Sequence, residues 1–213
     1  MSVPPFEQEH SVAKLVFIPI SHFFILPGAF FAWKLKLYDV FIVILMIFVL
    51  SDSYHFIEYG IFGITDIYIF WLGDYAGIFL GLLVMLMVWL SFPIELRYYI
   101  TLPTIVVTIF IGKLFHDTVV LFVLIAFYAF EMIIVHKLYM MQTHGVGILS
   151  FHVANLFFFA FLACLVGMGI FFLYWAGDPG YRYYFWRHLA GWHIPIFSAI
   201  SLALGYLYLL HYS

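Results

Sequence analysis

The stretch LYDVFIVILMIFVLSDSYHF, which covers residues 37–56, decides how this chain folds. Its interior, from Val40 to Leu50, consists of aliphatic residues, phenylalanine and methionine alone. A membrane-spanning helix needs roughly 20 predominantly apolar residues to cross the hydrocarbon core, and this stretch has that length. The sequence therefore predicts a transmembrane helix over 37–56, with Ser51 and His55 close to its end.

Apolar stretches of the same kind fill the rest of the chain. Of the 213 residues, 67% are hydrophobic and only 9% are charged, which excludes a water-soluble protein. Charged and turn-forming residues separate the stretches, and the connections are short. We expect transmembrane helices over roughly 12–33, 37–56, 67–91, 98–115, 118–138, 148–175 and 185–211. The predicted fold is one all-α domain over 1–213, a seven-helix bundle of a multi-pass integral membrane protein.

Composition also narrows the class of protein. Eight lysines and arginines and a formal charge of −3 give no basic patch, so nucleic acid is not an expected partner. The first apolar stretch lacks a positively charged flank and a cleavage site, so we expect a retained helix rather than a signal peptide. The basic residues are divided evenly between the two sides of the bundle, so they indicate neither its orientation nor its membrane.

Polar residues gather at one face of the predicted bundle, because consecutive helices alternate in direction. That face holds Ser51, His55, Asp66, Asp74, His116, Asp117, His188 and His193. An ionisable side chain inside the hydrocarbon region costs about 3 kcal/mol or more, so it indicates a functional site. Asp74, which follows Trp71 in a long apolar stretch, is the clearest case. The sequence predicts an intramembrane metal site here, with Asp74 or Asp66 as the carboxylate that orients a ligand or takes a proton.

The histidines at this face suit zinc. Ser51 and His55 are four residues apart, so on a helix both side chains point to the same side. Two further histidines, His188 and His193, come early in the last predicted helix. Three imidazoles and a water molecule form the usual open site of a catalytic zinc ion.

Four stretches of the chain resemble a known superfamily of membrane proteins. They are VAKLVFIPISHFFILPGAFFAWK (12–34), SDSYHFIEYG (51–60), FHD (115–117) and WHIPIFSAISLAL (192–204). The chain thereby resembles the seven-helix CREST superfamily of alkaline ceramidases, adiponectin-type receptors, lipid-remodelling enzymes and the transmembrane 8/myomaker family, and it is most similar to the myomaker branch. The resemblance implies a seven-helix fold, an outward N-terminus and a zinc site toward the outer or lumenal side.

The superfamily motif also implies roles for individual residues. It consists of Ser-x-x-x-His in helix 2, an Asp at the start of helix 3 and His-x-x-x-His in helix 7. The residues that match it are Ser51, His55, Asp74 and His193, with Asp66 as the alternative acid. The resemblance implies that the histidines bind zinc and that the acid assists them.

The histidine pair of the last helix departs from this motif, because His188 and His193 are five residues apart instead of four. On a regular helix their side chains would point about 140° apart. Three alternatives supply a third imidazole: His188 precedes the helix, a one-residue π-bulge near Gly191 absorbs the extra residue, or His116 is the third ligand. We favour the first two, so the backbone between Arg187 and His193 should be irregular.

Two functions fit these expectations. The first is zinc-dependent hydrolysis of a lipid amide or ester, of the ceramidase or phospholipase kind. His55, His188 and His193 would be the ligands. Asp74 would act as general base or orienting residue, and Ser51 would donate a hydrogen bond to the developing oxyanion. The alternative is a non-enzymatic, myomaker-like role in membrane remodelling or cell fusion, with a structural zinc. Expected partners are a lipid substrate or bilayer lipid, and a homodimer is left open.

Overall fold

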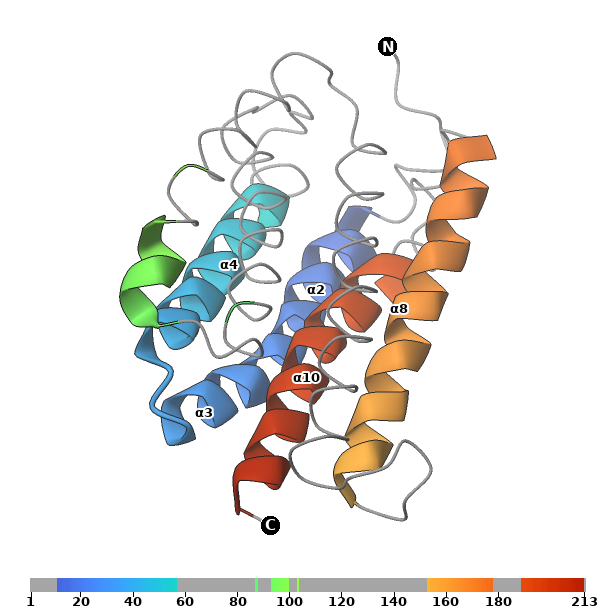
Figure 1. The fold of residues 1–213 in the computed structure, drawn as a ribbon. Coiled ribbons are helices and arrows are strands. Elements are labelled where there is room, and N and C mark those ends of the chain that lie inside the picture. The colour runs from blue at the N-terminus through green and yellow to red at the C-terminus, as the bar shows by residue number, and fades with distance from the viewer. Residues whose placement is uncertain are drawn as a thin grey trace.

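A computed structural model describes residues 11–56, 87, 93–99, 103, 153–177 and 189–212 of the chain. Every regular element in this part of the chain is a helix, which confirms the predicted helical class for these residues (Figure 1). Four helices are long and apolar enough to cross a membrane: Leu15–Lys34, Tyr38–Phe56, Val153–Phe171 and Leu189–Tyr212. This arrangement agrees with a multi-pass membrane protein. Most of the predicted spans 67–91, 98–115 and 118–138 lie outside the described residues.

The first span is a single helical rod with a break in its middle. It consists of α2 (Ser11–His22), the 3-10 turn η1 (Phe23–Ile25) and α3 (Leu26–Lys34). Pro27 explains the break, because proline has no N–H to donate to the carbonyl of Phe23, four residues earlier. That carbonyl instead accepts from the N–H of Leu26, three residues on, which is the 3-10 pattern.

A short reversal connects α3 to α4 (Tyr38–Phe56). The N–H of Leu37 donates to the Ala32 carbonyl at 2.9 Å and that of Lys36 to the Trp33 carbonyl at 3.0 Å. These two bonds form a Schellman motif, and Lys36 occupies its left-handed position with φ 60. The motif ends α3 sharply, and α4 therefore runs back alongside α3 and α2 (Figure 1).

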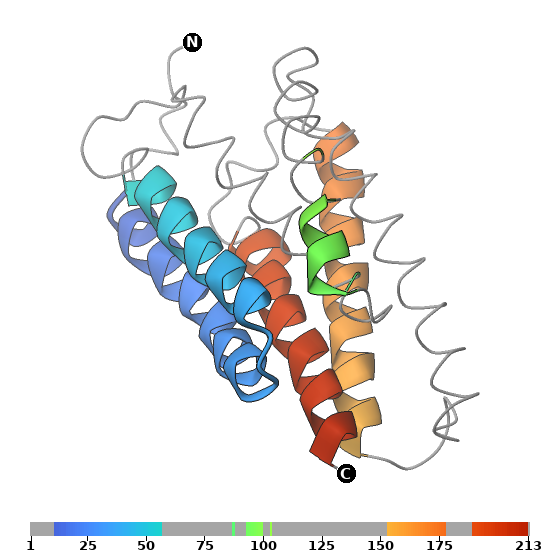
Figure 2. The same cartoon turned by 60° about the vertical axis from the view of Figure 1, so that its left-hand side comes forward.

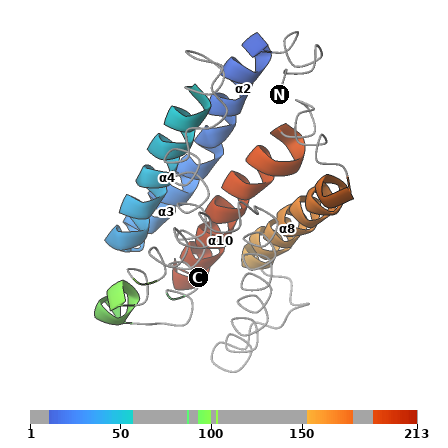
Figure 3. The same ribbon diagram turned by 90° about the horizontal axis from the view of Figure 1, so that it is seen from above.

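The two C-terminal helices complete the described part of the bundle. They are α8 (Val153–Gly177) and α10 (Ile194–Tyr212), and the π-helical turn η4 (Leu189–His193) leads into α10. Figures 2 and 3 show α10 between α8 on one side and the hairpin of α2, α3 and α4 on the other. The helix α10 runs parallel to α2 and α3, so its first turns lie at the same end of the bundle as the end of α4 (Figure 1).

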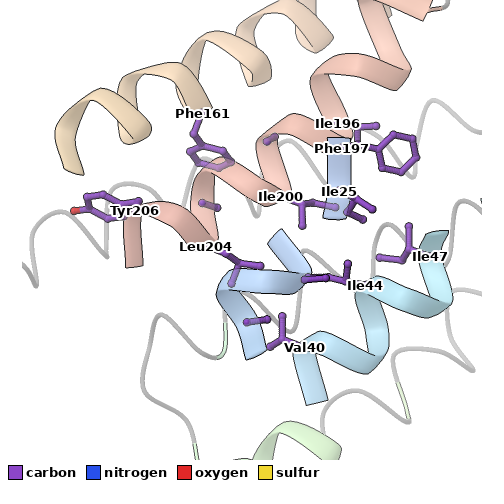
Figure 4. Packing of buried hydrophobic residues seen from close by; sticks show 14 of the residues in the cluster. Ile25, Val40, Ile44, Ile47, Phe161, Ile196, Phe197, Ile200, Leu204 and Tyr206 are labelled. Carbon is purple, nitrogen blue, oxygen red and sulfur yellow. The ribbon is translucent and has the colours of Figure 1, made fainter. Parts of the chain in front are cut away.

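The packed interior surrounds α10. Side chains from α4, η1, α8 and α10 meet there, including Ile44, Ile25, Phe161 and Ile200, all of which are fully or almost fully buried (Figure 4). Inside a bilayer the lipid tails are as apolar as these side chains, so close van der Waals packing rather than escape from water holds such helices together. Side chains at the start of α10 therefore have well-defined neighbours.

The turn η4 confirms the irregular backbone that the sequence predicts near Gly191. A π-helical turn bonds residue i to residue i+5 and so accommodates one extra residue. Gly191 lies in its middle, and a Cβ at this position would be 2.5 Å from the ring of Phe171. A glycine is therefore required for α8 to approach the turn, and the extra residue sets the direction of His193.

Candidate metal centre

Three histidines from three different helical segments meet inside the bundle. They are His22 at the end of α2, His55 in the last turn of α4 and His193 at the end of η4. All three are buried, with exposed fractions of 0%, 2% and 1%. Each offers a ring nitrogen, and these three nitrogens lie within 4.8 Å of one another. The group is therefore close enough to bind one metal ion.

The separation of the donor atoms suits tetrahedral coordination. The Nε2 of His22 and the Nδ1 of His193 are 3.1 Å apart. Two nitrogens bound to one tetrahedral zinc ion at about 2.0–2.1 Å are roughly 3.3 Å apart, so these two donors are already close to the required spacing. The ring of His55 lies 4.6 Å from that of His193 and 5.4 Å from that of His22, measured between centroids. The three rings thus surround a common point.

A carboxylate holds the first of these imidazoles. The Oδ1 of Asp52 lies 2.5 Å from the Nδ1 of His22, and the Asp52 side chain is 28% exposed. A carboxylate oxygen accepts, so the Nδ1 of His22 donates in this contact, and in the neutral imidazole the Nε2 keeps a lone pair for the side of the other histidines. A carboxylate behind a metal-binding histidine fixes both its tautomer and its orientation. The contact with Asp52 therefore restricts the orientation of the His22 ring.

The hydroxyl of Ser51 lies beside the three imidazoles. Its Oγ is fully buried and lies 3.2 Å from the Nε2 of His22, to which it can donate. Ser51 and His55 are four residues apart on α4 and face the same side, whereas Asp52 is rotated by about 100° toward the first span. One turn of α4 thus supplies a hydroxyl, a carboxylate and an imidazole.

Aromatic rings enclose the imidazoles. Phe197, fully buried one turn after His193, meets the ring of His22 edge-on, with ring centroids 4.7 Å apart. Tyr54 lies against His55 with ring centroids 4.8 Å apart. Apolar walls exclude water and restrict the rotamers of the imidazoles, so an ion bound here would experience a low dielectric constant.

The structure brings together some of the site residues expected from the sequence. Ser51, His55 and His193 lie side by side, as described above. The other expected residues, Asp66, Asp74, His116 and His188, lie outside the described residues.

Two members of the cluster were not among the expected site residues. His22 carried a signal that could have identified it, because it is an ionisable residue inside an apolar span. Asp52 carried no such signal, because it lies near the end of the apolar stretch 37–56. A scan against protein-family models finds no match to this chain, and a search of curated proteins finds none either.

Proposed function

We propose that the protein is a zinc-dependent intramembrane hydrolase that cleaves a lipid amide or ester. The observation that carries the proposal is the convergence of His22, His55 and His193, all buried, with their donor nitrogens within 4.8 Å of one another. Imidazole ligands suit zinc, and three of them leave the fourth tetrahedral position for water or substrate. Ionisable groups placed inside a membrane bundle are expensive, which favours a function for them.

The residues around the imidazoles suit acyl transfer to water. Zinc bound there would lower the pKa of its water to about 7 and polarise the substrate carbonyl. Ser51, whose hydroxyl lies among the imidazoles, would donate a hydrogen bond to the oxyanion that develops on the carbonyl oxygen. Asp52 would keep His22 in the ligating tautomer. Since Asp52 is engaged with His22, Asp74 remains the proposed proton acceptor, with Asp66 as the alternative.

A lipid is the proposed substrate because the site lies among helices that are long and apolar enough to span a bilayer. An acyl chain could then reach the imidazoles from the hydrocarbon region without crossing water. The resemblance to the CREST superfamily is part of this proposal, and Ser51, His55 and His193 occupy its motif positions. In that superfamily these motif positions together build a zinc site, in which the histidines are the ligands.

The test is lipid hydrolysis by the purified protein in detergent, with a mixed panel of ceramides and phospholipids and fatty-acid release as the readout. Chelation should abolish release, and added zinc should restore it. His193→Ala should be inactive, whereas His211→Ala should retain activity, because His211 is an exposed histidine at the far end of the same span, Leu189–Tyr212. Bound zinc without release of any fatty acid would contradict the enzyme and favour the membrane-remodelling role with a structural zinc.

A second candidate mechanism follows from one specific observation. Asp52 contacts Nδ1 of His22 and Ser51 contacts Nε2, which is the connectivity of a Ser-His-Asp hydrolase. In that case Ser51 would be the nucleophile and His22 its base. Zinc is favoured because Ser51 lies within α4, where main-chain N–H groups bond inside the helix and cannot form an oxyanion hole. Labelling of Ser51 by a fluorophosphonate, with hydrolysis that resists chelators, would establish the serine mechanism.

A further inference from the structure

The first span is interrupted directly after His22. The helix α2 ends at this residue, and the 3-10 turn η1 separates it from α3. Gly28 is the third residue of α3, so its N–H is among the four at a helix start that have no partner within the helix. The direction of His22 therefore depends on how the chain is held across this break.

A serine of α10 bridges the break. The Oγ of Ser201 accepts from the N–H of Gly28 at 2.8 Å and donates to the carbonyl of Phe24 at 2.6 Å. In a continuous α-helix these two main-chain groups, four residues apart, would bond to each other. The Ser201 hydroxyl, which is buried, takes the place of that bond.

The same contact brings two backbones together. A Cβ at Gly28 would be 3.1 Å from both the Cα and the Oγ of Ser201, so a larger residue here would displace Ser201 by a few tenths of an ångström. Small residues permit such close approach between membrane helices, and a hydroxyl can then reach the neighbouring main chain. The relative position of α3 and α10 is thereby fixed at this point.

We infer that Ser201 is a positioning residue of the proposed metal centre. Ser201 lies about two helical turns after His193, and Phe24 lies two residues after His22. The contact of Ser201 with Phe24 and that of His193 with His22 therefore join the same two segments. Ser201 holds the interrupted segment after His22 against α10. It thereby keeps the Nε2 of His22 close to the Nδ1 of His193, and these two atoms are 3.1 Å apart. This inference rests on the proposed function, because it assigns Ser201 to the same site.

The test compares Ser201→Ala with the matched control Ser53→Ala. Ser53 is two residues from His55, but its hydroxyl donates to the Val49 carbonyl of its own helix at 2.7 Å. Cobalt(II), whose visible absorption reports its ligand geometry, is titrated into each metal-free protein. Ser201→Ala should bind cobalt about tenfold more weakly than the wild type, a loss typical of removing a residue that orients a metal ligand. The visible spectrum of its bound cobalt should also differ from that of the wild type. Ser53→Ala should match the wild type.

A second readout needs no metal. In the metal-free protein, the ring-nitrogen NMR signals of His22 and His193 should shift in Ser201→Ala, while the signal of His211 stays in place. Unchanged His22 and His193 signals would overturn the inference. A wild type that binds no metal, with the NMR shifts intact, would overturn the proposed function but leave the positioning role supported.

Gly28→Ala covers the case in which Ser201→Ala does not fold. This variant retains the Ser201 hydroxyl but inserts a Cβ 3.1 Å from it, which pushes α3 away from α10. Its NMR signals should shift at His22 and His193 and not at His211. Folded Gly28→Ala protein without these shifts would contradict the role of Ser201.

Discussion

The helix α4 carries one aspartate near each end, and the two have different surroundings. Asp39, in its first turn, forms an ion pair with Arg97, in which Oδ2 and Nε are 3.0 Å apart and both side chains are largely buried. Asp52, in its penultimate turn, is 28% exposed and contacts the Nδ1 of His22, a fully buried imidazole. The first aspartate pairs with a guanidinium cation, whereas the second contacts a buried imidazole.

The surroundings of the two aspartates indicate a structural ion pair at Asp39 and a candidate metal site at Asp52. In the pair of Asp39 and Arg97 the opposite charges compensate each other, and its removal should affect mainly stability. The contact of Asp52 leaves the second nitrogen of His22 directed at two further imidazoles. An arrangement that concentrates donor nitrogens at one point is typical of metal binding.

The largest contrast should come from removing one group at each end. His55→Ala should reduce metal affinity by more than about 100-fold, because two imidazoles do not complete the site. Asp39→Asn should leave metal affinity unchanged but lower the free energy of unfolding by about 3 kcal/mol, since the largely buried ion pair with Arg97 is lost. Metal titration should show the loss of affinity in His55→Ala, and denaturation should show the loss of stability in Asp39→Asn. Equal metal affinities in the two variants would contradict the assignment of metal binding to the C-terminal end of α4.

Ser51→Ala should separate catalysis from metal binding. The variant should bind metal as the wild type does but release fatty acid about 100-fold more slowly, which is the usual cost of losing one donor to an oxyanion. Steady-state kinetics at saturating zinc gives kcat. A variant with full activity would exclude Ser51 from oxyanion stabilisation and from the serine mechanism alike.

Asp52→Asn should weaken metal affinity by roughly tenfold, in the range known for orienting carboxylates. The amide retains a contact with Nδ1 of His22 but no longer enforces its tautomer. Competition with a fluorescent zinc chelator measures the affinity. Asp39→Asn is the matched control, because it makes the same change on the same helix. If both variants keep wild-type affinity, Asp52 has no orienting role.

The smallest effect should come from Tyr212→Phe. Its hydroxyl donates to the Lys34 carbonyl at 3.3 Å at the exposed end of α10, at the opposite end of this helix from His193. Loss of one long, exposed hydrogen bond should lower the free energy of unfolding by less than about 1 kcal/mol. Zinc content and hydrolysis should be unchanged, and a loss of zinc would show that the two ends are coupled.

The sequence carried enough information for the helical class and for part of the site. The apolar length of 37–56 indicated a span where the structure has α4, and Ser51 and His55 follow from their four-residue spacing. The irregular backbone around Gly191 followed from the five-residue spacing of His188 and His193, since an unbroken helix would separate the two side chains. These signals are local and depend on spacing alone.

The places of His22 and Asp52 in the site could not be predicted from the spacing of residues in the sequence. Between Leu15 and Trp33 only Ser21 and His22 are polar, so the sequence marks His22 as an unusual residue but does not show which side chains it meets. The break after His22 and the bridge from Ser201 set the direction of His22, and they depend on a helix more than 170 residues further along the chain. Asp52 becomes an orienting residue only once His22 lies beside it.

The most direct test of the account is the zinc content of the protein, purified without chelators or a polyhistidine tag. Elemental analysis of the wild type should give about one zinc per chain, as three converging imidazoles require. His22→Ala, folded by circular dichroism, should hold less than about 0.2 zinc per chain. A wild type below that level would contradict the metal centre. A His22→Ala variant that keeps its zinc, while His188→Ala or His116→Ala loses it, would contradict the ligand set.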